Sequence, residues 1–149
     1  MKHWAQNGLK ALTSACALSL LATVAWSQTL TWLGVLPGGS WSQAFGVSAD
    51  GSVVVGWADN AAGQRRAFRW TENDGMQNLG TLPGGDESVA WGVSANGSVV
   101  VGRAYNAAGQ LHAFRWTASG GMQDLGTLGG GWSEAYGVSA DGSVVVGWA

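Results

Sequence analysis

Charged residues are scarce in this 149-residue chain. Lys and Arg number 7 and Asp and Glu number 9, which makes 11 % in all, against about a quarter in an average soluble domain. The net charge of −2 excludes the strongly basic surface that nucleic-acid binding requires. Hydrophobic residues at 46 % exclude a chain kept disordered by its charge. Glycine, at 25 positions, does not recur at every third place, which excludes collagen.

The single cysteine and both lysines lie within residues 1–27, which we interpret as a secretory signal peptide. The lysines make its start positive, residues 11–26 are apolar, and Ala25 and Ser27 are the small residues that signal peptidase needs before a cut. An uncleaved anchor is the alternative, but the apolar run is shorter than the roughly 20 residues that span a bilayer. No stable membrane span is therefore expected after cleavage. A lipoprotein cut before Cys16 fits less well, because too little apolar sequence precedes it.

Cleavage after Ser27 would leave residues 28–149 without cysteine, so we expect neither a disulfide nor a thiolate metal site. His112 would then be the only histidine, and zinc would lack the ligands it needs. No metal and no cofactor are therefore expected.

An internal repeat organises residues 28–149. A Leu-Gly pair recurs at positions 33, 79 and 125, at intervals of 46. Residues 33–78 and 79–124 align without a gap and share 32 of 46 positions, whereas the partial third copy, 125–149, lacks one position and covers about half of the unit. Repeats of this length are typical of solenoids, propellers and other arrays.

Each unit is expected to form four short antiparallel strands separated by glycine turns. The Asp-Gly pair at 50–51 suits a tight hairpin. The unbroken valine run at 53–55 predicts a strand that is covered on both faces. In the first unit the strands are expected at residues 44–47, 53–57, 67–71 and 76–82.

Four antiparallel strands in about 40–50 residues are the size of a β-propeller blade, and a propeller typically closes with about four to eight blades. The expected fold class is therefore all-β, with β-propeller-like blades in an incomplete array. An assembly of several chains and a small open sheet or sandwich are the alternatives. Since the apolar segment 144–149 would leave a strand without a neighbour, self-association through this C-terminal strand is also expected.

Segments 79–85, 92–102 and 112–116 resemble the bacterial HAF repeat, which is named for its His-Ala-Phe triplet. The resemblance covers nearly all of residues 30–149. It implies an exported repeat protein that is secreted or held at the cell surface or in the periplasm of a bacterium, and it brings no catalytic residue. The first unit departs from the triplet with Arg66 in place of the histidine, so histidine chemistry is not expected to be its purpose.

Motifs for catalysis are weak in this chain. A Ser-His-Asp triad would have to use His112, and no Gly-x-Ser-x-Gly elbow is present. The adjacent acids Asp86 and Glu87 are interpreted as surface groups and not as a glycosidase pair. The turn at Asp50 resembles the aspartate boxes of some propellers, but the second unit has Asn96 there, which favours a hairpin turn over a calcium site.

Tryptophan is the strongest lead to a binding site. Trp70 and Trp116 recur in register, and we expect them in the core. Other tryptophans hold places where the second unit carries a charged residue, which indicates exposure. We interpret these as ligand-binding residues that stack on sugar rings or anchor a protein partner, with partial burial at a sheet edge as the alternative. They are Trp41, Trp57, Trp132 and Trp148.

These features together predict an exported, non-catalytic β-repeat protein that acts as a binding or structural module at the cell surface or outside the cell. Similar weak sites on successive units would engage a repetitive surface glycan or protein ligand together. The alternative is a fragment of a secreted propeller enzyme, a hydrolase or lyase, whose active site lies in further blades.

Overall fold

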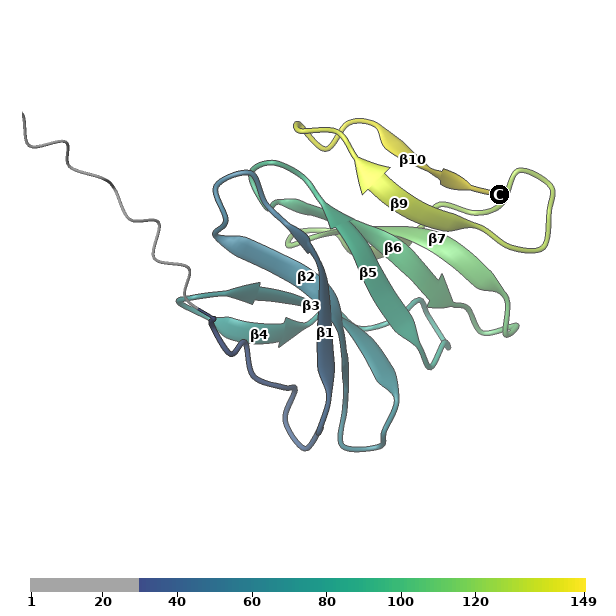
Figure 1. Cartoon of the computed structure of the whole chain (residues 1–149). Coiled ribbons are helices and arrows are strands. Elements are labelled where there is room, and N and C mark those ends of the chain that lie inside the picture. The colour runs from purple at the N-terminus through teal and green to yellow at the C-terminus, as the bar shows by residue number, and fades with distance from the viewer. Residues whose placement is uncertain (1–29) are drawn as a thin grey trace, which may run out of the picture. The chain divides into compact units, whose positions relative to one another are not determined.

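Ten short strands make up the regular structure of residues 30–149 (Figure 1). The computed structural model describes residues 30–149, so the expected signal peptide at 1–27 lies outside the described residues. Within 30–149 there is no helix, and the strands form antiparallel sheets of four, four and two strands. The all-β class expected from the sequence is confirmed.

The first sheet contains β1 (Ser42–Val47), β2 (Val53–Asp59), β3 (Arg65–Thr71) and β4 (Gly75–Asn78), in that spatial order. In the turn between β1 and β2, Gly51 has a φ of 76°, which glycine adopts without the steric cost that a side chain brings. The fourth strand was expected over 76–82 but ends at Asn78. One more backbone hydrogen bond follows at Leu79, and Gly80, with a φ of 79°, then turns the chain.

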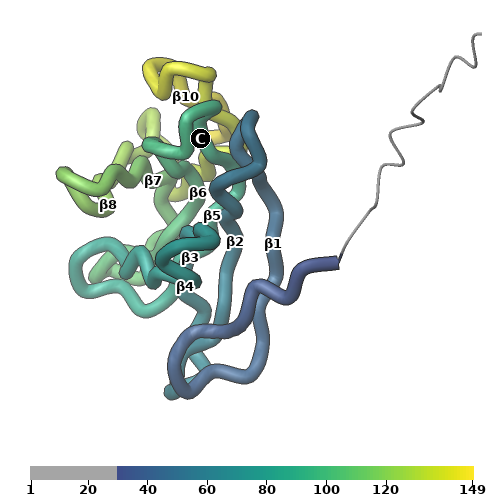
Figure 2. Tube along the Cα trace, turned by 90° about the vertical axis from the view of Figure 1, so that its left-hand side faces the viewer, coloured from purple at the N-terminus to yellow at the C-terminus, as the bar shows by residue number. Residues whose placement is uncertain are grey.

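The second sheet contains β5 (Ser88–Val93), β6 (Val99–Tyr105), β7 (Leu111–Thr117) and β8 (Gly121–Asp124), again in sequence order. The third sheet pairs β9 (Glu134–Val138) with β10 (Val145–Trp148). The sheets follow one another along residues 31–149, with β5 in contact with both β1 and β9 (Figure 1). In Figure 2, β1 and β2 run side by side and β10 lies at the top of the view.

The valines of the second strand in each sheet show how the sheets cover one another. Residues 99–101 in β6 are buried, as expected for a strand with a sheet on both sides. The corresponding Val144 and Val146 are 56 % and 60 % exposed, because their outer face has no covering sheet within the described residues. Trp116 is buried, which confirms its expected place in the core, and Trp70 is half-buried.

The joint between the first and second sheets is tight because a valine packs directly on a glycine. Val53 lies so close to Gly97, in the turn between β5 and β6, that an added Cβ would collide with it. Next to this contact, the Ala49 N–H donates to the Ala95 carbonyl at 3.1 Å. The two sheets are therefore joined by side-chain packing and by a backbone hydrogen bond at the same turn.

The joint between the second and third sheets has the same construction. Val99 packs on Gly142, where an added Cβ would again collide with the valine. The Ala95 N–H donates to the Ala140 carbonyl at 3.2 Å. The second sheet therefore receives a valine on one side and supplies a valine on the other.

Ser88 also links the first two sheets, and its removal tests the joint. The buried hydroxyl accepts from the Ala67 N–H at 2.8 Å and donates to the Gly80 carbonyl at 2.6 Å. Ser88→Ala leaves a buried N–H without a partner, so we expect the free energy of unfolding, measured by urea denaturation, to fall by about 1–3 kcal/mol. Ser42→Ala is the matched control, since within the described residues the Ser42 hydroxyl bonds only to the Gly34 carbonyl. Equal losses in the two variants would contradict this role for Ser88.

Candidate functional site

The four tryptophans proposed as ligand-binding residues lie at the ends of the first and third sheets. Trp41 and Trp132 come just before β1 and β9, whereas Trp57 lies in β2 and Trp148 in β10. The exposed fractions of Trp41, Trp132 and Trp148 are 64 %, 62 % and 55 %, which confirms the expected exposure of these three residues. Trp57 is half-buried, which agrees with the alternative interpretation of partial burial at a sheet edge.

Trp132 and Trp148 form the one ring pair that the structure makes from these four residues. Their ring centroids are 6.4 Å apart, and the rings are tilted by 44° to each other. Trp148 also borders an open hollow of about 280 Å³, whose apolar lining includes Leu125, Leu128 and Val145. The pair therefore offers two exposed aromatic rings next to a mostly apolar depression, which suits a ligand with a flat apolar face.

The first sheet has no exposed ring pair of this kind, because the side chain of Arg65 packs over the ring of Trp57. The guanidinium carbon of Arg65 lies 4.8 Å from the Trp57 ring centroid, which is a cation–π distance. Arg65 Nη1 in turn lies 3.3 Å from Glu87 Oε1 in the second sheet. Trp57 is therefore engaged inside the protein, and Trp41 is the accessible member of the first sheet.

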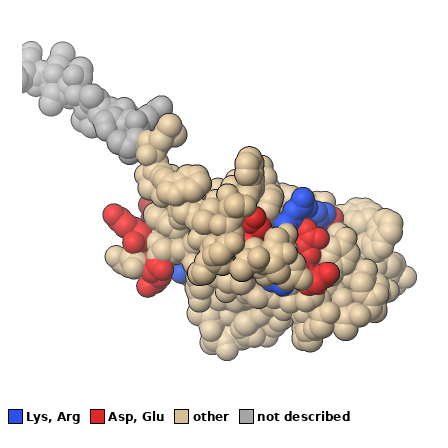
Figure 3. All heavy atoms as spheres, turned by 90° about the horizontal axis from the view of Figure 1, so that it is seen from below, with Lys and Arg blue, Asp and Glu red and all other residues tan. Residues whose placement is uncertain are grey.

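Where the second unit has charges in place of tryptophans, these charges form ion pairs between sheets. Glu87 pairs with Arg65, and Arg103 Nη1 lies 2.8 Å from Glu134 Oε1. Figure 3 shows that charged atoms of both signs gather into small groups within a largely uncharged face. The expectation of exposure at these places holds in part, since the Arg103 and Glu87 side chains keep only 31 % and 33 % of their surface exposed.

A row of aromatic side chains crosses all the sheets and was missed by the sequence reasoning. Phe45, Trp91 and Tyr136 have ring centroids 4.5 and 6.3 Å apart in succession. Each is the extra residue of a β-bulge, since the strand register shifts across it, and bulges redirect side chains. The sequence does place an aromatic residue between an alanine and a glycine in every unit, and this pattern could have indicated the row. The side of the sheet to which these aromatic side chains point depends on the strand register, which the sequence does not show.

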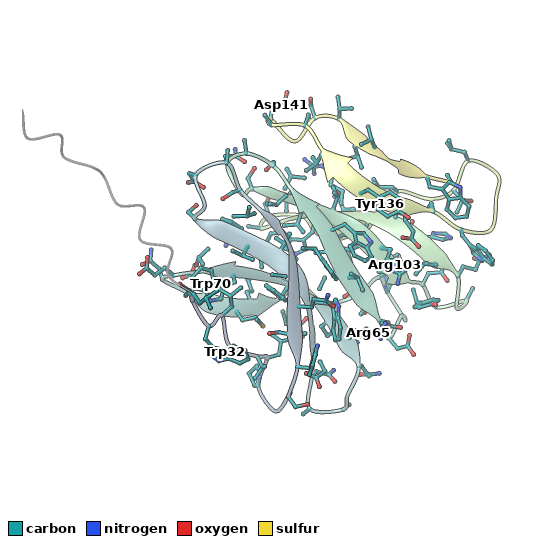
Figure 4. The ribbon with its side chains drawn as sticks, in the orientation of Figure 1. Trp32, Arg65, Trp70, Arg103, Tyr136 and Asp141 are labelled. Carbon is teal, nitrogen blue, oxygen red and sulfur yellow. The ribbon has the colours of Figure 1, made fainter. Side chains whose placement is uncertain are left out.

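The middle of this aromatic row is enclosed, and its ends are open. Phe45 and Tyr136 are 39 % and 54 % exposed, whereas Trp91 is half-buried. The Trp91 indole N–H is shielded from solvent and has no hydrogen-bond partner among residues 30–149. Arg103 lies over the Trp91 ring at 5.6 Å. Figure 4 shows Arg103 and Tyr136 near each other, although their strands, β6 and β9, belong to different sheets. The aromatic row is thus a packed strip with one polar end.

Tyr136 supplies that polar end. A hydrogen bond to the Glu134 carboxylate and partial burial raise the pKa of Tyr136 above its usual value of 10.0. The phenol is therefore neutral at physiological pH. Because Glu134 also pairs with Arg103, the Tyr136 hydroxyl lies beside this ion pair.

The aspartates of the β-turns have their oxygens occupied by hydrogen bonds. Asp50 Oδ1 accepts from the Ser48 hydroxyl at 2.6 Å and from the Ser52 N–H at 3.0 Å. Asp141 and Asn96 accept the matching bonds in the third and second sheets. Among residues 30–149, no group of three His, Cys, Asp or Glu residues could hold a metal ion. These carboxylates are therefore explained as turn-forming groups.

The turn aspartates make acid stability a testable property. Hydrogen bonds from neighbouring serines lower the pKa of Asp50 and of Asp141 from 3.8 to about 2. A lowered pKa in the folded state means that this stabilisation is present above about pH 4 and is lost as the pH falls through about 2. The double variant Asp50→Asn/Asp141→Asn should fold at pH 7, because Asn96 makes the same turn. We expect its urea midpoint to fall less between pH 4 and 2 than that of the wild type. An identical fall would contradict this assignment.

His112 is the residue on which a catalytic triad would depend. Its Nδ1 lies 2.8 Å from Asp124 Oδ2, and its Nε2 lies 3.5 Å from Asn106 Nδ2. Within the described part of the chain, no serine hydroxyl forms a hydrogen bond with His112. The first sheet has Arg66 in the matching place. The His112–Asp124 pair therefore connects β7 to the end of β8 and is not aligned with a nucleophile.

Known proteins give no guide to the function of this site. No family model matches the chain, and no curated protein matches it. No helix in the described part of the chain is long and apolar enough to cross a membrane. The exposed tryptophans and the aromatic row are accordingly the features from which a function can be argued.

Proposed function

We propose that this chain is an exported, non-catalytic binding and structural module that belongs to the bacterial HAF-repeat proteins. It acts at the cell surface, in the periplasm or outside the cell after removal of the signal peptide at 1–27. Its unit is a propeller-like blade of four antiparallel strands. Strand order and register support this unit: Ser42 pairs with Ala58 in the first sheet, and Ser88 pairs with Ala104, 46 positions later, in the second.

The observation that carries the binding proposal is the exposed pair Trp132–Trp148 beside its hollow. A tryptophan ring offers a large, rigid apolar face at little cost in side-chain entropy. The faces of sugar rings are flat and partly apolar, so an exposed ring can stack on them while the sugar hydroxyls stay in water. We therefore assign a glycan as the ligand, with a protein partner as the other outcome of the test.

Several such positions on one chain give the proposal its mechanism. Trp41 is exposed on the first sheet, and Trp132 and Trp148 are exposed on the third. A polymer that contacts both places binds the second site intramolecularly, at a high effective concentration. Weak individual sites can then hold a long glycan firmly.

The test uses a glycan array and pull-down with the polysaccharides that the array identifies. The double variant Trp41→Ala/Trp132→Ala should lose binding by about 30-fold or more, which corresponds to the roughly 2 kcal/mol of one aromatic anchor. Trp32→Ala is the matched control, because Trp32 is also exposed but lies outside the proposed site. Unchanged glycan binding in the double variant would contradict the proposal, and protein capture without glycan binding would point to the other kind of ligand.

A further inference from the structure

Each joint between sheets brings together two different surfaces. One is the outward side of the second strand, which we call the valine face, formed by Val53 and Val55 in the first sheet and by Val99 and Val101 in the second. The other is the first strand with its following turn, which we call the receiving strand. It is marked by Ala90 and Gly97 in the second sheet and by Ala135 and Gly142 in the third.

Within residues 30–149, one valine face and one receiving strand have no partner. Val144 and Val146 form the valine face of the third sheet, and both are exposed, whereas the matching valines of the first two sheets are buried. β1 is the receiving strand of the first sheet. Its Ala44 is exposed, although Ala90 and Ala135 are buried in the matching places.

The turn that follows β1 also lacks a packing partner within residues 30–149. An added Cβ at Gly51 would meet nothing within 4 Å, while the matching glycines of the other two sheets are filled by a valine. No backbone N–H within residues 30–149 donates to the Ala49 carbonyl at this turn, whereas the Ala95 carbonyl accepts one hydrogen bond from the preceding sheet. The open receiving strand therefore lacks the same two contacts that the open valine face could supply.

We propose that a second copy of this chain docks head to tail, with the valine face of its third sheet covering β1 and the following turn. Val144 of one copy then packs on Gly51 of the next, as Val53 packs on Gly97. The Ala140 N–H of one copy donates to the Ala49 carbonyl of the next. Each contact repeats one that the chain already makes twice within itself.

The charges at this surface are compatible with docking. At the joint between the second and third sheets, Arg103 pairs with Glu134. By position in the units, the proposed joint has the uncharged Trp148 and Gln43 in these two places, so neither place brings an unpaired charge to the joint. Arg103 keeps 31 % of its side chain exposed at its own joint. Trp148 is therefore expected at the rim, where it stays accessible to a ligand.

The partner is a second copy because each chain carries both halves of the joint. Two different surfaces meet, so the contact is heterologous and passes from copy to copy, as a ring if the rotation closes and as an open chain if it does not. Edge-to-edge pairing of β10 with another β10 would instead join one surface to itself and stop at a dimer. The two arrangements therefore respond differently to substitutions on β1.

The experiment uses chain recovered from the exported fraction of a host that expresses the full reading frame, analysed by sedimentation velocity. The wild type should associate with increasing concentration. Ala44→Glu blocks the receiving strand and Val146→Glu blocks the valine face, and both sites are exposed in the single chain. Each variant alone should be monomeric, and a 1:1 mixture should form a heterodimer through the two surfaces that remain intact. Gln77→Glu, on the exposed end of β4, is the control for added charge and should associate like the wild type.

Three results would overturn the proposal: a wild type that stays monomeric at all concentrations, self-association of Ala44→Glu, or a mixture that stays monomeric. Self-association of Ala44→Glu would favour pairing through the β10 edge. The double variant Ala44→Glu/Val146→Glu should stay monomeric in every mixture. If Val146→Glu fails to fold by circular dichroism, Val144→Lys blocks the same face and takes its place.

Discussion

Replacing Phe114 with alanine is expected to lower the free energy of unfolding by about 3–5 kcal/mol, the range for a fully buried phenylalanine. Phe114 lies in β7 with no exposed surface, within the cluster that also holds Val100 and Ala90. Its ring lies against Gly102 in β6, so close that an added Cβ there would meet it at 2.9 Å. Because glycine has no side chain that could move into the space, the substitution leaves a cavity.

Urea denaturation followed by tryptophan fluorescence measures this loss. Phe45→Ala is the control, since Phe45 is an exposed member of the aromatic row and loses less buried surface. We expect a clearly smaller effect for Phe45→Ala. Similar losses in the two variants would contradict the assignment of Phe114 to the centre of the core.

Gly97→Ala is expected to carry two separate costs. At a φ of 70° a side chain is strained, by about 1–2 kcal/mol. The new methyl group also collides with Val53 across the joint between sheets, and overpacking of this kind adds about 1–3 kcal/mol. Gly51→Ala has the first cost only, because its φ is 76° and the space beside it is open.

Thermal and urea denaturation of the two glycine variants separate the costs. We expect Gly97→Ala to be the less stable variant, and Val53→Ala in the same chain to restore part of the loss. The partial rescue would show that Val53 is the colliding residue. Equal destabilisation by Gly51→Ala and Gly97→Ala, or no rescue, would contradict the valine-on-glycine joint.

Local features of the fold could be predicted from the sequence because short-range chemistry determines them. The Asp-Gly and Asn-Gly pairs at 50–51 and 96–97 predicted the turns between first and second strands, since these residues suit tight hairpins. The valine runs predicted strands that need cover on both faces, as residues 99–101 have. The core position of Trp116 followed from its place in register with Trp70.

The parts that could not be predicted depend on contacts between strands far apart in the chain. Trp57 was expected to be available to a ligand, but Arg65, which faces it from β3, occupies its ring. The direction of Phe45 and Tyr136 depends on bulges, which follow from the pairing of two strands. Comparison of units could mark variable positions, but it could not distinguish an exposed tryptophan from one that an arginine covers.

Binding of one glycan at two chain lengths tests most directly whether the exposed tryptophans act together. The affinity of the wild type for the polysaccharide with the strongest array signal, and for its short oligosaccharides, is measured by titration calorimetry. We expect the polysaccharide to bind about 100-fold more tightly than the oligosaccharide, and Trp132→Ala/Trp148→Ala to lose this advantage. Equal affinities for the two lengths, or an advantage that survives the loss of both tryptophans, would contradict a multivalent aromatic binding module.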